Sequence, residues 1–297
     1  MVSCGNKFDE VFTLIKSVML ITKYDVLFHL FTDDKEMNFD KKQRFSNFFY
    51  KIYAIQYPPY VDEAEWKTLF KPCATQRIFL PLVLASVDSI IYLDTDVLFL
   101  QPINKLWDVF ETFNAIQISS MTKEHEEASA GWYNRFARHP FVPPYGINSG
   151  VMLMNLTRMR DTKWVDEIIS FHRKYKYDIT WGDQDLINIY FHFHPDKLHE
   201  ISCNWNYRPD HCMYMSTCKE AEVEGIFVVH GNRGVFHNEN MPTFKAVYDS
   251  LFQFPDEEYD DLIILRQNLE NNLKRYEDTR CGSMGNLFLK NYEKYLT

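Results

Sequence analysis

Long hydrophobic runs and clustered positive charge are both absent from the sequence. The longest apolar stretch, residues 90–100, is interrupted by aspartate and falls short of the roughly 20 residues that a membrane-spanning helix needs. The 297 residues include 41 acidic and 32 basic ones, for a net charge of −9, and no basic stripe offsets this charge. The sequence therefore argues against a nucleic-acid partner, because binding to phosphates needs clustered Lys and Arg.

A secretory signal peptide, an internal repeat and a low-complexity linker are also missing. The first residues, MVSCGNKF, have the pattern of the last part of a strand that runs into a glycine turn. A domain seldom begins inside a strand, so we expect natural sequence to precede this segment. The length fits one large α/β domain or two small ones, with ample material for a core.

Closely spaced cysteine pairs, which a zinc site would need, do not occur among the six cysteines. The preferred interpretation of the segment 203–218 is a disulfide, with Cys212–Cys218 as the shortest closure, and it would imply an oxidising lumen. The alternative is a set of free buried cysteines. Cys4 and Cys73 lie in apolar surroundings and are predicted to be packing residues.

Strand and helix patterns alternate along the chain, which predicts an α/β fold with a parallel sheet covered by helices. From residue 255 onward, leucines repeat at helical spacing between residues 262 and 273. We therefore expect a large domain over residues 1–254, then an amphipathic helix and a loose tail over 255–297, the tail starting at about Thr279. The expected strands are 25–34, 50–57, 90–100, 115–120, 148–156 and 225–230, and the expected helices are 10–22, 64–84, 161–175 and 183–193.

Two aspartates interrupt the apolar segment IIYLDTDVLFL. Asp94 and Asp96 are two residues apart, so they face the same side of a strand and can converge on one cation where the strand ends. Mg²⁺ and Mn²⁺ prefer oxygen ligands and leave positions open for substrate phosphates. A pair of solvated or capping aspartates is the alternative, but ligands in open α/β sheets bind at this end of the strands. The placement favours a metal site.

The segment HGNRG follows another apolar strand and predicts an anion site. A neutral imidazole at His230 could complete the two-carboxylate set and would favour Mn²⁺ over Mg²⁺. Gly231 and Gly234 would let backbone N–H groups approach phosphate oxygens, and Arg233 could neutralise their charge. On its own, a histidine at a strand end is more often only hydrogen-bonded.

Two polar segments are unremarkable when they are taken alone. Asp183 and Gln184 follow Gly182 at the start of a predicted helix, where an acidic residue commonly acts as a cap. Asn148 and Ser149 form a polar loop that enters an apolar strand.

Together, however, the segments RIFLPLVL, IIYLDTDVLFL, NSGVML, WGDQDLIN and HGNRG, in this order, resemble the retaining nucleotide-sugar transferases of glycosyltransferase family 8. The resemblance covers about residues 2–251. It implies the single-domain GT-A fold, a Rossmann-like α/β fold with a mixed, mostly parallel sheet flanked by helices and an Asp-x-Asp metal site. The flanking segments EHEEASAGWYNRFARHP, WNYRPDHC and FVVHGNRGVFH look closest to the glucoside xylosyltransferase branch. That branch transfers xylose from UDP-xylose, in α1,3 linkage, to O-linked glucose on EGF-like repeats such as those of Notch.

The resemblance also implies roles for individual residues. Asp94, Asp96 and His230 would bind Mn²⁺ or Mg²⁺, and Asp183 and Gln184 would lie beside the anomeric carbon as the catalytic pair. The residues expected to hold the UDP-sugar are Ser3, Cys4, Gly5, Arg77, Thr95, Asn148, Ser149, Gly231, Arg233 and Gly234.

One departure from the family pattern concerns the segment after the metal histidine. Many members continue as His-x-x-Gly-x-x-Lys, whereas here the glycine comes one position later and Phe236 stands at the lysine position. Arg233 is expected to supply the missing charge, with His237 as the alternative. Because Gln184 is an amide and a poor nucleophile, front-face attack with the departing phosphate as base is favoured over a covalent intermediate.

Aromatic residues interleaved with Asn and Arg are predicted to form the acceptor side. Rings and hydrogen-bonding groups suit a sugar face, although packing of the rings on the domain's flank is an equally good interpretation. The sequon at Asn155 directly continues an apolar strand, which argues against its glycosylation. The predicted acceptor residues are Trp132, Tyr133, Arg135, Trp205 and Tyr207.

Three other functions remain open from the sequence. One is a family 8 transferase that uses UDP-glucose or UDP-galactose. The second is a non-catalytic UDP-sugar-binding protein, and the third is a metal-dependent phosphohydrolase, which would need a second metal cluster or a base beside the phosphate. The family resemblance further implies an enzyme of the Golgi or endoplasmic reticulum lumen, with an N-terminal type II membrane anchor that lies outside this chain.

Overall fold

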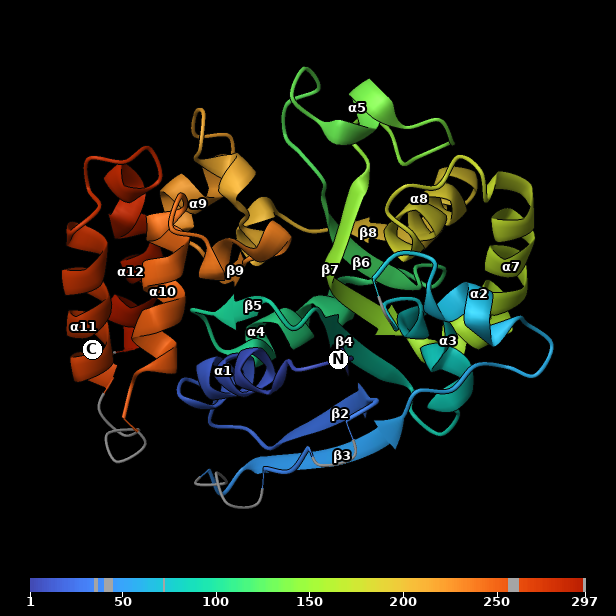
Figure 1. Ribbon diagram of the computed structural model, residues 1–297, viewed down its shortest axis with the longest axis horizontal. Coiled ribbons are helices and arrows are strands. Elements are labelled where there is room, and N and C mark those ends of the chain that lie inside the picture. Colours follow the sequence, from blue (N-terminus) through green and yellow to red (C-terminus); the bar gives the residue numbers. More distant parts are fainter. Residues whose placement is uncertain (35–36, 40–44, 72, 256–261, 296–297) are drawn as a thin grey trace.

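The structure is a computed structural model, and it describes residues 1–34, 37–39, 45–71, 73–255 and 262–295 (Figure 1). Its strands are β1 (Val2–Ser3), β2 (Val26–Thr32), β3 (Phe48–Ala54), β4 (Ser89–Leu93), β5 (Val97–Phe99), β6 (Ser119–Lys123), β7 (Ile147–Asn155), β8 (Leu198–Glu200) and β9 (Val228–His230). Its α-helices are α1 (Phe8–Met19), α2 (Glu63–Lys67), α3 (Gln76–Val83), α4 (Ile103–Trp107), α5 (Trp132–Phe136), α6 (Leu156–Asp161), α7 (Trp164–Tyr175), α8 (Asp183–Phe193), α9 (Lys219–Glu224), α10 (Pro242–Phe252), α11 (Leu262–Lys274) and α12 (Gly285–Tyr295).

The strands form three hydrogen-bonded groups, in the orders β1-β2-β3, β4-β7-β6-β8 and β5-β9. The first group is parallel throughout, and β8 runs parallel to β6. Strand β7 runs antiparallel to both β4 and β6, and β5 runs antiparallel to β9. This mixed arrangement with helices on both sides confirms the predicted α/β class.

Strand β7 separates two hydrophobic cores. Val151 and Leu153 face the core that includes α1, α10, α11 and α12, whereas Met152 and Met154 face the core of α3, α6, α7 and α8. Alternate residues of a strand point to opposite faces, and a central strand covered on both sides is apolar throughout. Figure 1 shows the two helical layers on either side of this strand.

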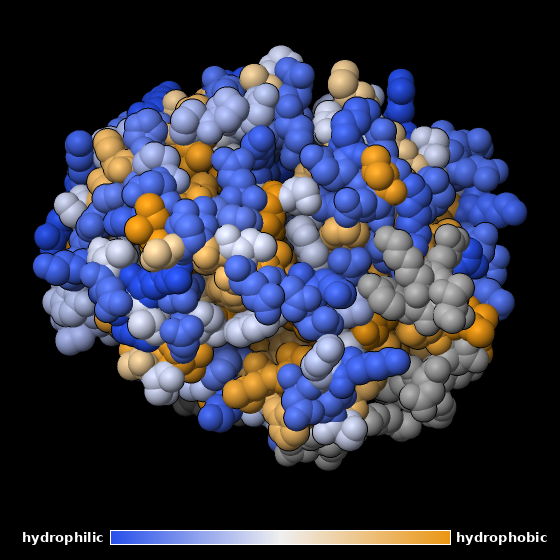
Figure 2. Space-filling model, turned by 180° about the vertical axis from the view of Figure 1, so that it is seen from behind, coloured by the Kyte–Doolittle hydropathy of each residue, from blue (hydrophilic) through white to orange (hydrophobic). Residues whose placement is uncertain are grey.

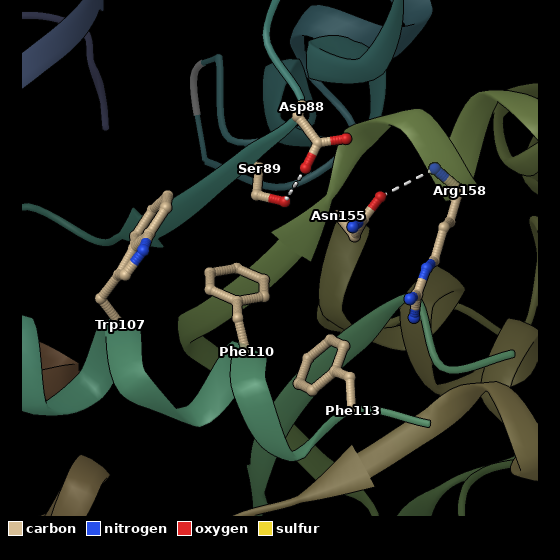
Figure 3. Close-up of a pocket in the computed structure, with 7 residues that line it drawn as sticks. All are labelled: Asp88, Ser89, Trp107, Phe110, Phe113, Asn155 and Arg158. Atoms are coloured by element: carbon tan, nitrogen blue, oxygen red, sulfur yellow. Dashed lines mark hydrogen bonds between the residues drawn. The ribbon is translucent and has the colours of Figure 1, made fainter. Parts of the chain in front are cut away.

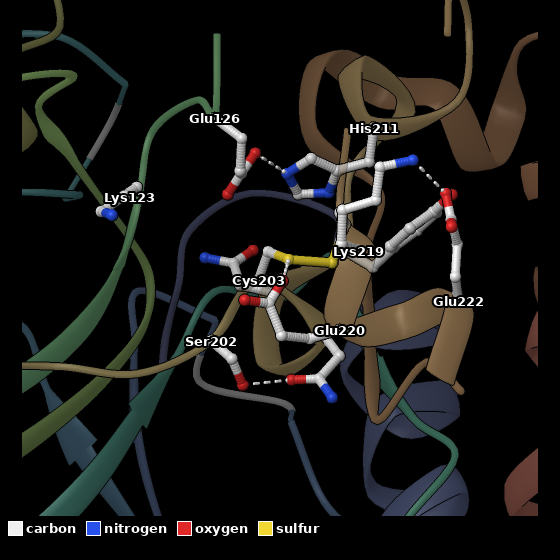
Figure 4. The surroundings of a disulfide bond; sticks show 12 residues. Lys123, Glu126, Ser202, Cys203, His211, Lys219, Glu220 and Glu222 are labelled. Atoms are coloured by element: carbon white, nitrogen blue, oxygen red, sulfur yellow. Dashed lines mark hydrogen bonds and ion pairs between the residues drawn. A yellow bond between two sulfur atoms is a disulfide. The ribbon is translucent and has the colours of Figure 1, made fainter. Parts of the chain in front are cut away.

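Three disulfide bonds use all six cysteines, and they differ from the predicted pairing. Cys203 bonds to Cys218, next to the ion pair of Glu126 and His211 (Figure 4). Cys212 bonds to Cys281, so the prediction of Cys212–Cys218 is wrong. The prediction assumed that cysteines close in sequence pair with each other. The partner of Cys212 lies instead 69 residues away, between α11 and α12.

The bond between Cys4 and Cys73 corrects the prediction that these two are packing residues. It ties the end of β1 to the loop that enters α3. Cross-links over 69 residues remove much of the conformational freedom of the unfolded chain. The three disulfide bonds together fit an oxidising compartment.

After residue 261 the structure describes two helices, α11 and α12. Helix α12 follows α11 and buries Leu287, Phe288 and Tyr292 in the core, so the prediction of a loose tail after about Thr279 is wrong. Phe288 and Tyr292 are four residues apart, which is helical spacing, but the segment is short and mostly polar, and the prediction did not use this pair. The single helix predicted over 64–84 is in fact two helices, α2 and α3.

Figure 2 shows the back of the molecule, which is mostly hydrophilic, with apolar groups gathered toward the lower edge. Figure 1 places β2 and β3 at that edge, and Leu27, Phe49 and Ile52 on these strands are exposed. Among the residues that the structure describes, no helix combines the length and the apolar character needed to cross a membrane.

Candidate active site

The chain turns between β4 and β5 at Asp94, Thr95 and Asp96. Strand β4 is apolar from Ile90 to its end, and β5 is apolar again, so the carboxylates come where the backbone leaves the sheet. The N–H of Asp94 donates to the carbonyl of Gly150 on β7 over 2.9 Å, which holds the turn against the central strand. The prediction that the carboxylates lie at a strand end is confirmed, but the single strand expected over 90–100 is two strands, β4 and β5, separated by this turn.

His230 ends β9 and reaches the same place. The antiparallel register of β9 and β5 sets it opposite Val97, next to the turn. Its Nε2 lies 3.4 Å from Oδ1 of Asp96 and 3.9 Å from Oδ2 of Asp94. One ligand atom from each of the three residues lies within 4.8 Å of the others. Two carboxylates and one imidazole nitrogen are a donor set that suits Mn²⁺.

Gly150 lets the imidazole come this close to β7. A Cβ built at this position would lie 2.2 Å from Cε1 of His230, so any larger residue would overlap the ring. The glycine of the segment NSGVML is therefore required by close approach.

A chain of hydrogen bonds fixes the tautomer of His230. Nδ2 of Asn206 donates to Oδ1 of Asn148 over 2.8 Å, so Oδ1 of Asn206 is the atom that faces the histidine. His230 Nδ1 lies 2.8 Å from that oxygen and must donate to it. Nε2 therefore carries the lone pair and points at the two carboxylates, which is how a metal-binding histidine is held. Asn206 was missed in the sequence, where only its aromatic neighbours stood out.

The electrostatics of the turn favour the ionised carboxylate. Burial alone would raise the pKa of Asp96, but when His230 is protonated its hydrogen bond and charge outweigh this effect, with help from Lys71, and lower the pKa to about 2. Lys71 is exposed and precedes α3. It is a cation near the site that the sequence did not single out.

Arg77 on α3 is buried among acidic groups. Its guanidinium donates to Oδ1 of Asp94 over 2.8 Å and to the carbonyl of Ser149 over 2.6 Å, and it forms an ion pair with Asp183. The guanidinium carbon also lies 4.3 Å from the centre of the Tyr92 ring. Arg77 was predicted to contact the nucleotide or the sugar. In the structure it positions the two carboxylates.

Asp183 and Gln184 open α8, as predicted, but neither caps it. Gly182 is the residue before the helix, with a φ of 57° that suits glycine, and its Cα packs on Phe70. Asp183 is turned inward to Arg77. Burial raises the pKa of Asp183, and the charge of Arg77 only partly offsets this rise.

Gln184 belongs to a polar network that was missed in the sequence. Its Oε1 accepts from the N–H of Ser149 over 3.2 Å, and its Nε2 donates to Oε2 of Glu124 and to Tyr133, both over 3.3 Å. Glu124 also accepts from Nδ2 of Asn148 over 2.6 Å. Burial raises the pKa of Glu124 against the opposing charge of Arg208 and the bond from Asn148. A glutamate directly after a buried strand was the available signal.

The residues predicted for the nucleotide end lie along β1 and the turn. Gly5 has a φ of 74° and its N–H donates to the side chain of Asp33, whereas Cys4 is bound to Cys73. Ser3 is buried next to them. The hydroxyl of Thr95 donates to Glu10 on α1 over 3.1 Å.

The predicted phosphate loop is a short helical turn, η6 (Asn232–His237), directly after His230. Arg233 and Gly234 both have positive φ, of 59° and 72°. The N–H of Gly231 donates to the carbonyl of Asp96 over 2.7 Å. The Arg233 side chain is 53% exposed and pairs with Asp210, while His237 pairs with Glu10.

The predicted acceptor residues separate into two groups. Trp205 and Tyr207 are buried core residues that pack on other rings, so the alternative interpretation, packing, holds for them and their acceptor role is wrong. Tyr133 is buried as well, but its hydroxyl joins the Gln184 network. Trp132 and Arg135 lie on the same helix α5 and are not buried.

Three comparisons bear on the identity of the chain. The family model described as Glycosyl transferase family 8 matches residues 8–233. The chain is 46% identical to Glucoside xylosyltransferase 1 of Homo sapiens, over 99% of this chain and 70% of that protein. It is 45% identical to Glucoside xylosyltransferase 2 of Mus musculus, with the same coverage.

The fold also matches solved structures. Mouse Xyloside xylosyltransferase 1 in its apo form gives a TM-score of 0.55 at 17% identity, over 79% of this chain and 96% of that one. The galactosyltransferase LgtC in complex with donor and acceptor sugar analogs gives 0.63 at 18% identity, over 86% and 97%. The matched residues 8–233 include Asp94, Asp96 and His230, and the chain belongs to glycosyltransferase family 8.

Proposed function

We propose that this protein transfers xylose from UDP-xylose to a glucoside with retention of configuration. The proposed acceptor is O-linked glucose on an EGF-like repeat, and the new linkage is α1,3. Identity of about 45% to proteins named glucoside xylosyltransferases, over nearly the whole chain, supports the donor and the acceptor class. The observation that carries the chemistry is the approach of His230 Nε2 to Asp94 and Asp96.

Asp94, Asp96 and His230 would hold a divalent cation, with Mn²⁺ favoured by the imidazole nitrogen. When bound, the cation supplies positive charge to the donor diphosphate as its bond to the sugar breaks. The fixed tautomer of His230 and the glycine behind its ring support this role, because the nitrogen lone pair is aimed before any ligand arrives.

Charge on the departing phosphate would be met by the loop after His230. The loop offers backbone N–H groups of η6 and the exposed Arg233, and the charge of Lys71 acts on the neighbouring Asp96. Such groups stabilise the charge that develops during transfer without moving. Arg233 and His237 are both paired with carboxylates, and His237 is the weaker candidate because a guanidinium is always charged whereas an imidazole is not.

Front-face attack is the proposed route to retention. A covalent intermediate needs a free carboxylate beside the anomeric carbon, and Asp183 is instead paired with Arg77. The neighbouring Gln184 is held by Ser149 and Glu124, so it would orient the sugar rather than attack it. A trapped adduct between the sugar and Asp183 would contradict this route.

The acceptor would enter on the side of α5. Glu124 joins Gln184 and Asn148, and Tyr133 joins the same network from α5. Burial raises the pKa of Glu124, and its carboxyl group would bind an acceptor hydroxyl by a hydrogen bond. Trp132, on the same helix, would offer a ring to the acceptor sugar.

We further propose that the enzyme acts in the lumen of the Golgi or endoplasmic reticulum, with a type II membrane anchor in sequence that precedes this chain. The three disulfides support a lumenal site, because such bonds are rare in the reducing cytosol.

A donor screen tests the proposal. The purified protein is mixed with Mn²⁺, a β-glucoside acceptor and UDP-xylose, UDP-glucose or UDP-galactose, and released UDP and the disaccharide are measured. We expect product from UDP-xylose alone, with loss of activity after chelation. Turnover with another donor would reassign the sugar. Phosphate release without transfer would favour a phosphohydrolase, and UDP binding without turnover would favour a binding protein.

A further inference from the structure

A second hollow lies at the end of β4 that is remote from the aspartates. It has a volume of about 420 Å³ and lies between the start of β4, the end of β7 and the segment formed by α4 and the short helix η2 (Asp108–Thr112). Ser89 and Asn155 are direct partners in the β4–β7 register, so their side chains share this face. Figure 3 shows the residues around it: Asp88, Ser89, Trp107, Phe110, Phe113, Asn155 and Arg158.

The Oδ1 atom of Asn155 accepts a hydrogen bond within the protein, whereas its Nδ2 atom is left for the hollow. Its Oδ1 accepts from the N–H of Arg158 over 2.9 Å and caps α6, which fixes the orientation of the amide. Among the described residues, none accepts a hydrogen bond from its Nδ2. The side chain is half-buried and lines the hollow.

Asn155 is also the asparagine of the one Asn-x-Ser/Thr sequon in the sequence, Asn155-Leu156-Thr157. The sequence argued against glycosylation because the sequon continues an apolar strand. In the structure the strand ends at Asn155 and α6 begins at Leu156, so the sequon stands at a strand–helix junction. That objection therefore does not hold.

A ledge of aromatic rings faces this asparagine. We use the term aromatic ledge for Trp107, Phe110 and Phe113, which recur every three residues along α4 and the segment after it. The ring centres are 5.0 Å and 5.2 Å apart, and Trp107 is 47% exposed. Arg158 donates to the carbonyls of Asn114 and Gln117, which holds the end of the ledge next to the sequon.

We propose that Asn155 carries an N-linked oligosaccharide whose first N-acetylglucosamine packs on the aromatic ledge. The C–H face of a pyranose stacks on an aromatic ring, and the exposed carboxylate of Asp88 and hydroxyl of Ser89 can accept from sugar hydroxyls across the hollow. The attached sugar gives an apolar partner to the exposed ring of Trp107 and to the half-buried rings of Phe110 and Phe113. The inference concerns passage through a secretory compartment and is independent of the catalytic activity proposed above.

The reaction joins Nδ2 of Asn155 to C1 of the reducing-end sugar of a lipid-diphosphate-linked oligosaccharide, catalysed by the host cell's transferase. The N–C1 bond forms as the C1–O bond to the diphosphate breaks. The lipid diphosphate leaves with the electron pair, and the amide nitrogen loses one proton. Oδ1 is not changed, so the cap of α6 is retained.

The modification is tested on the full chain secreted from a eukaryotic cell behind a cleavable signal. We expect one glycan, removed by peptide N-glycosidase F as a single mass shift and located at Asn155 by peptide mass spectrometry. Thr157→Ala should abolish the shift, whereas the matched variant Thr157→Ser, which keeps the sequon, should retain it. Secreted, disulfide-bonded protein with unmodified Asn155 would overturn the proposal.

The packing on the ledge is tested by thermal unfolding. Glycans trimmed to one N-acetylglucosamine are compared with fully deglycosylated protein, in the parent and in Trp107→Ala. We expect the single sugar to raise Tm by about 1–3 °C in the parent and by less than half of that in the variant. Ile116→Ala, which changes an exposed apolar residue outside the hollow, serves as control and should keep the full increment. Equal increments in all three proteins would overturn the ledge's role.

Discussion

The metal cluster and the loop after it lie side by side, yet they are built in different ways. Asp94, Asp96 and His230 are held by partners within the protein, through Arg77 and Asn206. The loop from residue 231 to 237 instead contains the exposed side chain of Arg233, and both Arg233 and Gly234 have a positive φ. Under the proposed function, the protein would fix the ligands of the divalent cation in advance and would leave the contacts to phosphate adjustable. Changes to the first part should therefore abolish activity, and changes to the second should tune it.

The largest effect is expected from the metal ligands. Asp96→Asn should lower kcat/KM by more than about 10³-fold, because the cation that stabilises the leaving diphosphate is lost. UDP release with Mn²⁺ measures the loss, and isothermal titration with Mn²⁺ checks the metal. Retention of Mn²⁺ affinity in this variant would contradict the assigned ligand.

Gly150→Ala is expected to have the second largest effect on activity, although residue 150 would touch neither the metal nor the sugar. The added Cβ would collide with the His230 ring, and a displacement of about 1 Å at a reacting centre costs roughly 10²-fold in rate. Circular dichroism should show a folded protein. Val151→Ala, the next residue on the same strand, is the control: it creates a cavity but leaves His230 in place. Full activity in Gly150→Ala would mean that the histidine position is not critical.

Asn206→Ala removes the acceptor that sets the tautomer of His230. We expect a loss of about 10–100-fold in Mn²⁺ affinity. Asn206→Asp keeps an acceptor oxygen and should restore most of that affinity. Equal affinity in the alanine and aspartate variants would argue that the hydrogen bond does not orient the histidine.

Arg233→Ala tests the contribution of the loop from residue 231 to 237. It should raise KM for the UDP-sugar by about tenfold, because an exposed charged contact is worth on the order of 1–1.5 kcal/mol, and should leave Mn²⁺ affinity unchanged. Asp210→Asn frees Arg233 from its partner and should lower KM slightly. Loss of metal binding in either variant would remove the distinction between the two parts.

The smallest expected effect is a pH dependence of stability from Asp210. Burial alone would raise its pKa, but the hydrogen bond and charge of Arg233 outweigh it, so the pKa in the folded protein is lowered. A depressed carboxyl pKa contributes stability above the pKa of the unfolded chain, and this contribution is lost as pH falls through the folded pKa. Since Arg233 is half exposed, Asp210→Asn should cost at most about 1 kcal/mol at pH 7 and nothing at low pH, as measured by urea unfolding. A constant cost across pH would contradict the pairing.

The sequence predicted those parts of the site that local pattern controls. Two aspartates inside an apolar strand, and a histidine at the end of another, are visible because they break a hydrophobic run. Local sequence pattern also predicted α8 and β7. The predicted ends of α8 are the observed ones.

What the sequence did not predict depends on contacts between distant segments. Asn206 is one polar residue among aromatic neighbours, and its role appears only when η4 (Cys203–Asn206) packs beside β9. Trp205 and Tyr207 looked like acceptor residues, but burial in the core decides their role. The cysteine pairs could not be assigned for the same reason, since two of the three bonds join segments 69 residues apart.

The bond between Cys212 and Cys281 decides how far the protein can be shortened. It fastens the last two helices to the segment that carries Arg208 and Asp210, a few residues from Asn206. A chain truncated by mutation after residue 261 would lack Cys281, would leave Cys212 as an unpaired thiol, and would uncover the apolar face of α10 that packs on α11. Helices α11 and α12 therefore belong to the same hydrophobic core as the strand that carries His230. We expect a truncated protein to aggregate.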